Sequence, residues 1–240
     1  MILAYDNEVF NATISMTNEA PLFPRTNLKD SRLSRYTGVL GTETRITFNV
    51  NAQAQMVAIA GHNLTTSATV KIEGNATNDW TSPAFSETIT YNEDMLVNIF
   101  APATYQYWSI SIDDSTNTED LKIGGVFLGD YVKLQNTFAH TVTDRLIDTT
   151  TRSVSLSGQV YTDVNHDYYE YDLHFPKLTL SDVNETKQAM RFTKKEPLYI
   201  ILDATSFIEF SGLYCTIDDL QYSRVFDDFY TTDISLRQAK

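Results

Sequence analysis

The stretch Met56–Leu64, "MVAIAGHNL", carries the chain from an apolar strand into a polar turn. Its first residues are almost continuously apolar, which is typical of a strand buried in the core of a β-sandwich. Gly61 permits backbone angles that are closed to other residues, and the side chains of His62 and Asn63 can hydrogen-bond to neighbouring loops. We therefore interpret Gly61, His62 and Asn63 as a structural corner, with a catalytic or metal-binding role for His62 as the alternative.

The segments on either side alternate between polar and apolar residues. Arg45–Val50 reads "RITFNV", Ala68–Gly74 reads "ATVKIEG" and Tyr105–Asp114 reads "YQYWSISIDD". Alternation with a period of two predicts strands with one buried face. In the last segment Trp108 shares a face with Ile110, so we interpret it as a core or inter-sheet plug rather than a platform for a sugar ring.

Composition and the spacing of these segments predict a mainly β protein with two domains. Aromatic residues make up 12% of the chain, and strand-like segments recur at intervals of roughly ten residues, as in antiparallel sandwiches. We predict an antiparallel β-sandwich over residues 1–135 and a second β domain, a barrel or meander, over residues 136–240. One short helix is expected in the second domain near residues 181–192, with Ser181 as its N-cap.

The formal net charge of −13 limits the classes of partner. The acidity is spread along the chain and opposes binding to nucleic acid or to an anionic membrane surface. The first ten residues lack the basic and long apolar regions of a signal peptide, and no run reaches the roughly 18 apolar residues of a membrane span. The single cysteine, Cys215, excludes an intramolecular disulfide and a cysteine-rich zinc site.

Sequence motifs for catalysis or cofactor binding are not found. No nucleophile elbow, phosphate-binding loop or dinucleotide fingerprint occurs. Paired spacing of the kind that binds zinc is also missing among the four histidines, which are His62, His140, His166 and His174. We therefore predict that the protein is not an enzyme and needs no cofactor.

One segment has part of the pattern of a calcium loop. Asp163, Asn165 and Asp167 follow the one-three-five spacing of its oxygen ligands. Tyr168 stands where such a loop needs glycine, and His174 stands where it needs glutamate. A polar hairpin turn is therefore the preferred interpretation, and melting the protein with and without calcium distinguishes the two.

Three longer segments together resemble a known family. They are "FPRTNLKDSRLSRYTG" (residues 23–38), "ITFNVNAQAQMVAIAGHNLTTSATVKIEGNATNDW" (residues 46–80) and "YQYWSISIDDSTNTEDLKIGGVFLGDYVKL" (residues 105–134). They look like the discoidin-like, galactose-binding-like β-sandwich of structural proteins in the tails and baseplates of tailed bacteriophages and prophages. The second half is similar too, through "RSVSLSGQVYTDVNHDYYEYDLHFPKLTLSD" (residues 152–182).

The resemblance implies a structural protein of the virion tail, made in the cytoplasm of a bacterial host. We expect contacts with other tail or baseplate subunits and a ring-shaped homo-oligomer. A carbohydrate-binding module that contributes to host-surface recognition is the alternative, because discoidin-like folds often bind glycans with aromatic and acidic loop residues. A hydrolase with an unrecognised pair of carboxylates is the third hypothesis.

Overall fold

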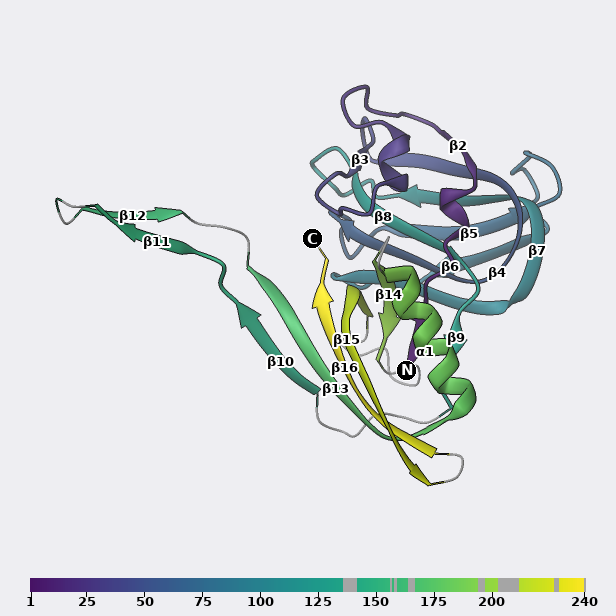
Figure 1. Cartoon of the computed structure of the whole chain (residues 1–240). Coiled ribbons are helices and arrows are strands. Elements are labelled where there is room, and N and C mark those ends of the chain that lie inside the picture. Colours follow the sequence, from purple (N-terminus) through teal and green to yellow (C-terminus); the bar gives the residue numbers. More distant parts are fainter. Residues whose placement is uncertain are drawn as a thin grey trace.

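The computed structural model describes residues 1–135, 142–155, 157, 159–163, 167–193, 197–202, 212–226 and 229–239. Within these residues the chain forms two large sheets, a small two-stranded ribbon and one α-helix (Figure 1). Every strand pair in this part of the chain is antiparallel. The prediction of a mainly β, antiparallel protein is confirmed.

The first sheet has the order β3-β8-β4-β7-β5-β6, and β2 pairs with β4 beside it. The bounds are β2 (Thr13–Met16), β3 (Thr37–Gly38), β4 (Glu43–His62), β5 (Thr69–Asn75), β6 (Phe85–Ile89), β7 (Met95–Asp113) and β8 (Lys122–Gly129). Two 3-10 helices, η1 (Glu8–Phe10) and η2 (Arg25–Lys29), precede most of these strands.

Two irregularities interrupt the long ladder between β4 and β7. The register shifts between Asn49 and Ala52 and again between Ala54 and Met56, and Asn51 has a φ of 45°. Extra residues of this kind bend a strand and increase its twist. The ladder therefore curls, so that β2 pairs with the first half of β4 and β8 with the second half.

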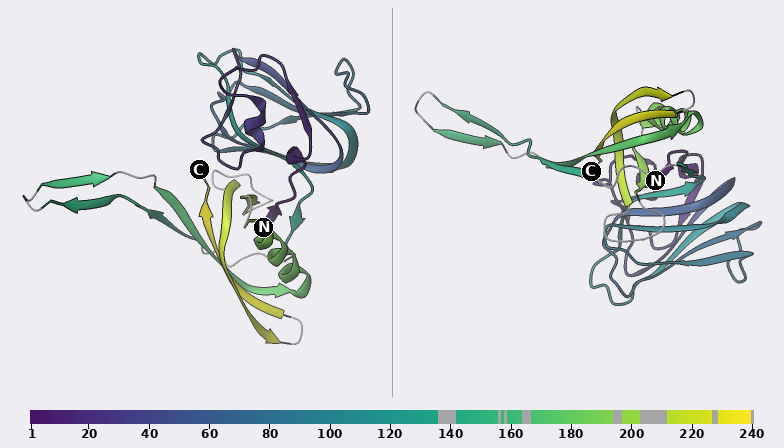
Figure 2. Two further views of the ribbon diagram at one scale, coloured as in Figure 1. Left: turned by 45° about the horizontal axis from the view of Figure 1, so that its top comes forward. Right: turned by 90° about the horizontal axis from the view of Figure 1, so that it is seen from below.

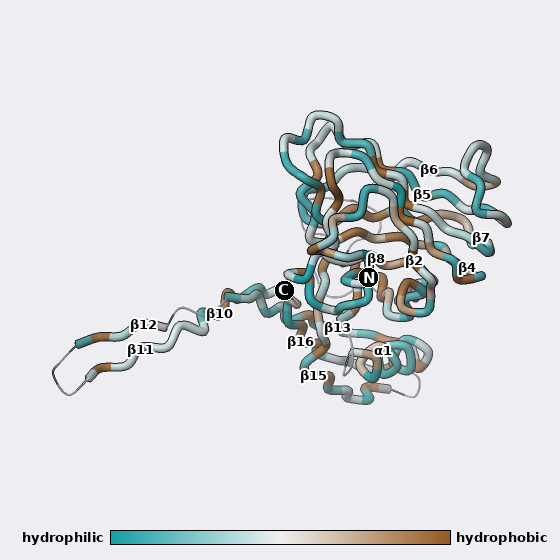
Figure 3. Tube along the Cα trace, turned by 90° about the horizontal axis from the view of Figure 1, so that it is seen from above, coloured by the Kyte–Doolittle hydropathy of each residue, from teal (hydrophilic) through white to brown (hydrophobic). Residues whose placement is uncertain are grey.

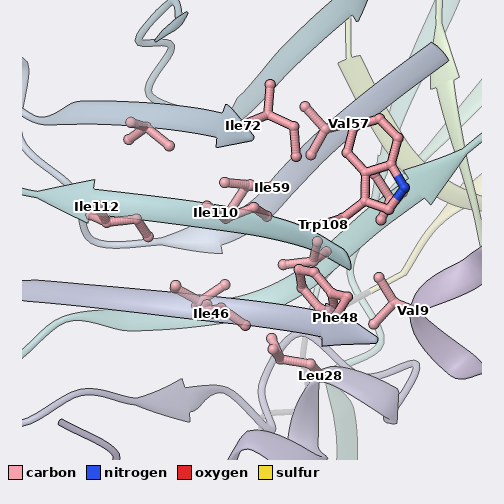
Figure 4. Packing of buried hydrophobic residues seen from close by; sticks show 14 of the residues in the cluster. Val9, Leu28, Ile46, Phe48, Val57, Ile59, Ile72, Trp108, Ile110 and Ile112 are labelled. Atoms are coloured by element: carbon pink, nitrogen blue, oxygen red, sulfur yellow. The ribbon is translucent and has the colours of Figure 1, made fainter. Parts of the chain in front are cut away.

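The curled sheet encloses a large apolar core (Figure 4). Phe48 and Trp108, which are cross-strand partners, are both fully buried. Val9 of η1 and Leu28 of η2 pack against the same cluster. The irregular N-terminal segment thus contributes to the core of the first sheet.

The second half of β4 is apolar on both of its faces. Val57 and Ile59 point into the core of the first sheet, whereas Met56, Ala58 and Ala60 belong to a separate cluster shared with the second sheet. Strands buried on both faces lose the polar alternation of half-exposed strands. This double burial accounts for the continuous apolar sequence at this place.

The second sheet has the order β10-β13-β16-β15-β14-β1-β9. Its strands are β1 (Ile2–Ala4), β9 (Val132–Lys133), β10 (Val142–Ile147), β13 (Tyr168–Thr179), β14 (Leu198–Ile201), β15 (Gly212–Phe226) and β16 (Phe229–Gln238). Among the described residues this sheet is an open meander and does not close into a barrel. β1 and β9 precede residue 136 in the sequence and yet join this second sheet. The division of the chain into two domains at that residue therefore stays a prediction.

The single α-helix of the described residues, α1 (Leu180–Thr193), covers the second sheet on the face away from the first. Val183 and Ala189 are buried there with Cys215. No helix in the described part of the chain is long and apolar enough to span a membrane.

The N-cap of α1 is Thr179 rather than the expected Ser181. Thr179 Oγ1 accepts a hydrogen bond from the Asp182 backbone N–H at 3.2 Å, and the Asp182 carboxylate accepts one from the Thr179 N–H at 3.1 Å. This reciprocal pair is a capping box, which satisfies two backbone donors at once. Asp182 also accepts a bond from the Gln135 N–H at 2.9 Å.

A two-stranded arm extends from one end of the second sheet. It consists of β11 (Thr151–Val154) and β12 (Val160–Asp163), which continue outward from β10 and β13. The arm stands clear of the body of the molecule in every view (Figures 1 and 2).

Replacing Thr179 with alanine is expected to lower the free energy of unfolding by about 1 kcal/mol, because the capping hydrogen bond is lost. Ser181→Ala is the matched control and should change it by less than about 0.5 kcal/mol, as for an ordinary surface change. Urea unfolding followed by circular dichroism measures both. A larger loss in Ser181→Ala would show that the cap has been assigned to the wrong residue.

Candidate functional site

The corner at Gly61–Asn63 is built from hydrogen bonds to loops that lie far away in the sequence. Gly61 has a φ of 65°, and a Cβ there would lie 3.3 Å from the Leu33 Cβ and 3.4 Å from the Gly124 Cα. A side chain would therefore be strained by the backbone angle and crowded by its neighbours.

Both ring nitrogens of His62 contact backbone groups. The Leu64 N–H donates to Nδ1 at 3.3 Å, which leaves the proton on Nε2, 3.1 Å from the Asn92 carbonyl oxygen. Burial lowers the pKa of His62 below 6.5, despite the opposing effects of the Asn92 carbonyl and of the Asp94 and Asp114 carboxylates. A neutral ring bonded on both sides suits a structural role, and that role stays a prediction tested below.

Asn63 connects the corner to the start of β8 and to the segment just before it. Its Oδ1 accepts from the Lys122 N–H at 2.8 Å, and its Nδ2 donates to the Asp120 carbonyl at 3.0 Å. The Asn63 carbonyl in turn accepts from Asn117 Nδ2 at 2.9 Å. The Asn63 side chain thus provides hydrogen bonds that backbone groups would otherwise provide, at the point where the ladder between β4 and β8 ends.

Asp114, which the sequence analysis did not single out, organises the same corner. It is 1% exposed and accepts bonds from the Thr65 N–H at 2.8 Å, from Thr65 Oγ1 at 2.5 Å and from Asn117 Nδ2 at 3.1 Å. Burial would raise the pKa of Asp114, but these hydrogen bonds outweigh it and hold the pKa below its ordinary value. Its place directly after a strand, in "DDSTN", was the available signal.

Trp108 is surrounded by aromatic side chains inside the first sheet. Its ring lies 5.7 Å from those of Phe85 and Phe100 and 5.3 Å from that of Tyr105, and its Nε1 donates to the Ala52 carbonyl at 3.1 Å. The side chain is fully buried, so its ring presents no open face to a ligand. Its assignment as a core plug remains the prediction that this geometry favours.

A polar cleft of about 360 Å³ lies on the first sheet, where β4 begins and β7 ends, next to the segment after β2. Two of the residues that line it, Thr44 and Ile112, are buried. The other residues that line it are all polar or charged, and they are Thr17, Asn18, Glu43, Arg45, Ser111 and Asp113. These donors and acceptors lie on three different segments that the pairing of β4 with β2 and β7 brings together.

Arg45 connects this cleft to an aromatic side chain. Its guanidinium pairs with Glu73, which is 6% exposed, and donates to Ser109 Oγ at 3.0 Å. The Trp80 ring lies over it, with 5.3 Å between the Arg45 Cζ and the ring centroid. Trp80 Nε1 donates to Asn78 Oδ1 at 2.9 Å, which orients the indole within the loop between β5 and β6.

A larger hollow, of about 690 Å³, lies between the two sheets. Its walls include Leu202 and Gly212, which border residues 203–211 outside the described part of the chain. The cleft at Arg45 is the better candidate site because every residue that lines it is described.

The weak candidate for a calcium site lies largely outside the described residues. Asn165 and the side chain of Asp163 are not described, so the site formed with Asp167 stays a prediction. His140 and His166 also lie outside the described residues. His174 is described, and its Nδ1 lies 2.6 Å from Asp233 Oδ1. Among the side chains that are described, no group of three or more metal-binding residues is arranged to hold an ion.

Comparison with known proteins finds similarity only among solved structures. No protein-family model matches the chain, and no curated protein matches it. The family 32 CBM from C. perfringens NanJ, solved in complex with galactose, aligns with a TM-score of 0.42 and 14% identity over 55% of this chain and 100% of that one.

Two further structures match over a similar extent. Chitosan-binding module 1 of a chitosanase/glucanase from Paenibacillus sp. IK-5 has a TM-score of 0.41 and 14% identity, over 51% of this chain and 96% of the module. The CBM32 of AlyQ, in complex with 4,5-unsaturated mannuronic acid, has a TM-score of 0.40 and 19% identity, over 52% and 96%. With TM-scores below 0.5, these similarities decide nothing about what this chain binds.

The lowered pKa of His62 predicts a pH dependence of stability. The unfolded chain takes up a proton near pH 6.5 while the folded chain still resists it, so stability is fully present above that pH and falls below it. His62→Gln should remove this contribution. The stability advantage of the wild type over the variant, measured by urea unfolding from pH 8 to pH 5, is therefore expected to shrink below pH 6.5. A stability advantage that stays constant from pH 8 to pH 5 would contradict this prediction.

Proposed function

We propose that the chain is a non-catalytic binding protein and that the polar cleft beside Arg45 holds a carbohydrate. The observation that carries this proposal is the composition of the cleft lining, in which every residue except Ile112 is polar or charged. Sugar hydroxyls act as donors and acceptors at once, so mixed polar walls of this kind suit them. The volume of about 360 Å³ is at the small end of ligand sites, which favours one or two sugar rings.

The electrostatics of the cleft favour a neutral sugar over an anionic one. Glu43 and Asp113 lie directly opposite each other on β4 and β7, and both are exposed. The positive charge of Arg45 is already paired with Glu73. A carboxylated or sulfated sugar would meet two unpaired carboxylates, in a chain whose net charge is −13.

Two neighbouring carboxylates also raise the question of glycoside hydrolysis. That reaction needs one carboxyl group that keeps its proton, which enzymes achieve by placing it in apolar surroundings. Glu43 and Asp113 are instead solvent-exposed at the ends of their strands. Binding without cleavage is therefore the function that the cleft supports.

A structural role in the tail of a tailed bacteriophage is the second candidate, and the projecting arm is the observation that favours it. An isolated ribbon of two short strands is only marginally stable in water. An arm that reaches away from its own core is suited to contacting another subunit of an assembly. The protein would then be made in the host cytoplasm and reside in the virion, where carbohydrate binding would serve contact with the host surface.

The carbohydrate proposal predicts saturable binding to at least one neutral glycan on an array, with the sugar recovered intact. Glu43→Gln should weaken that binding tenfold or more, because a hydrogen bond to a charged acceptor contributes about 1.5–3 kcal/mol. The control is Glu93→Gln, which changes an exposed glutamate that does not line the cleft. Equal affinity of both variants, or no binding to any neutral glycan, would count against the cleft.

The tail proposal predicts that the chain is a component of purified virus particles. A density map of the intact particle would show the folded chain with its arm against a neighbouring subunit. Particles that assemble fully and contain no copy of the chain would contradict it.

A further inference from the structure

Among the described residues β11 and β12 pair only with each other, so the arm has two open edges, and its outer end is apolar. Val154 and Val160, which are directly opposite each other, are 67% and 62% exposed, and Tyr161 is 56% exposed. Hydrophobic residues mark the outer ends of both strands (Figure 3). Exposed strand edges offer unpaired N–H and C=O groups to another strand, and charges or proline usually block them.

The charge distribution indicates which partner suits the arm. Residues 149–162 contain one basic residue, Arg152, and no acidic residue, although the chain as a whole holds 18 basic and 31 acidic residues. Copies of so acidic a protein repel each other over most of their surfaces. Apart from Asp163 at its inner end, the arm is therefore a segment where two copies can meet without bringing carboxylates together.

The hydrogen bonding within the arm shows which backbone groups point outward. The Ser155 N–H donates to the Gln159 carbonyl at 2.8 Å, which makes this pair the hydrogen-bonded pair that closes the turn. In an antiparallel ladder such pairs alternate with non-hydrogen-bonded ones. By this alternation Ser153 and Tyr161 form a hydrogen-bonded pair inside the arm. The backbone N–H and C=O groups of Val160 and Thr162 instead point to the open edge of β12.

We infer that the arms of two copies pair edge to edge through β12, in antiparallel orientation about a two-fold axis at Tyr161. In this register Val160 of each copy lies opposite Thr162 of the other, so the outward backbone groups of both residues are satisfied. The two Tyr161 side chains form a non-hydrogen-bonded pair on one face, where aromatic cross-strand pairs are stabilising. No pair of like charges is created along β12. Side chains from one face of β12 lie beside side chains from the same face of β12 in the other copy, as a two-fold axis requires.

This inference rests on the second candidate function, assembly, and is independent of the carbohydrate cleft. The contact joins two copies and is therefore distinct from the ring expected from the sequence. Because few residues pair, the area buried is at the low end for protein interfaces, and the association should be weak in solution.

A single cysteine introduced at the centre of the pairing tests it in the full chain. Cα atoms of a non-hydrogen-bonded antiparallel pair lie about 4.5 Å apart, within the range of a disulfide. The native Cys215 is fully buried and does not compete. Under mild oxidation, Tyr161→Cys should therefore give a disulfide-linked dimer, twice the 27.2 kDa of the chain on a non-reducing gel.

Ser153→Cys is the matched control. Ser153 lies directly opposite Tyr161 in the arm, at the same distance from its tip, and would be the centre of pairing through β11 instead. Dimer from Tyr161→Cys and little from Ser153→Cys supports the inference. Dimer from Ser153→Cys alone, equal dimer from both, or none from either overturns it.

A second pair of variants tests the same contact without a cross-link. Thr162→Pro removes an outward N–H of β12, and Val154→Pro removes the equivalent N–H on the β11 edge, without loss of a bond inside the arm. In sedimentation velocity at rising concentration, wild type and Val154→Pro should shift toward dimer, and Thr162→Pro should remain monomeric. A wild-type chain that stays monomeric yet joins virus particles would overturn the pairing and leave the tail proposal standing.

Discussion

The structure depends on one sheet layer that is buried on both faces. In the second half of β4, Val57 and Ile59 complete the core of the first sheet, while Met56, Ala58 and Ala60 form the surface on which the second sheet rests. Burial of apolar area on both sides stabilises the layer and joins the two sheets. A polar residue at Ala58 would leave an unsatisfied group between the sheets, so the arrangement of the whole molecule is set here.

Local patterns in the sequence predicted strands within β4, β5 and β7 of the first sheet and the position of the helix, whereas β2 and β3 lie in a segment that looked irregular. Alternation fixed the faces of Arg45–Val50 and Tyr105–Asp114, and the expected helix at residues 181–192 is observed as Leu180–Thr193. Its cap was assigned two residues too late, because Ser181 and Thr179 are both good caps and only the position of Asp182 distinguishes them. The sequence could not distinguish a closed barrel from an open sheet in the second half of the chain, because closure depends on which strands are neighbours.

Contacts between distant segments explain what the sequence could not show at the candidate site. His62 and Asn63 were visible because their residue types at a turn are informative by themselves. The pairing of Arg45 with Glu73, and the stacking of Trp80 over it, join β4, β5 and a loop, and no spacing in the sequence indicates this. Asp114 lay within reach of sequence reasoning, as an aspartate that follows a strand and precedes a serine and a threonine.

The position of β1 has a consequence for how the molecule is made. Ile2–Ala4 is synthesised well before its two partners, Val132–Lys133 and Leu198–Ile201, and lies between them in the second sheet. During synthesis on the ribosome this apolar strand must therefore wait for a partner encoded nearly two hundred residues later. Pairing across such a distance is slow to form. The first sheet can therefore fold while the second sheet still lacks its final strands.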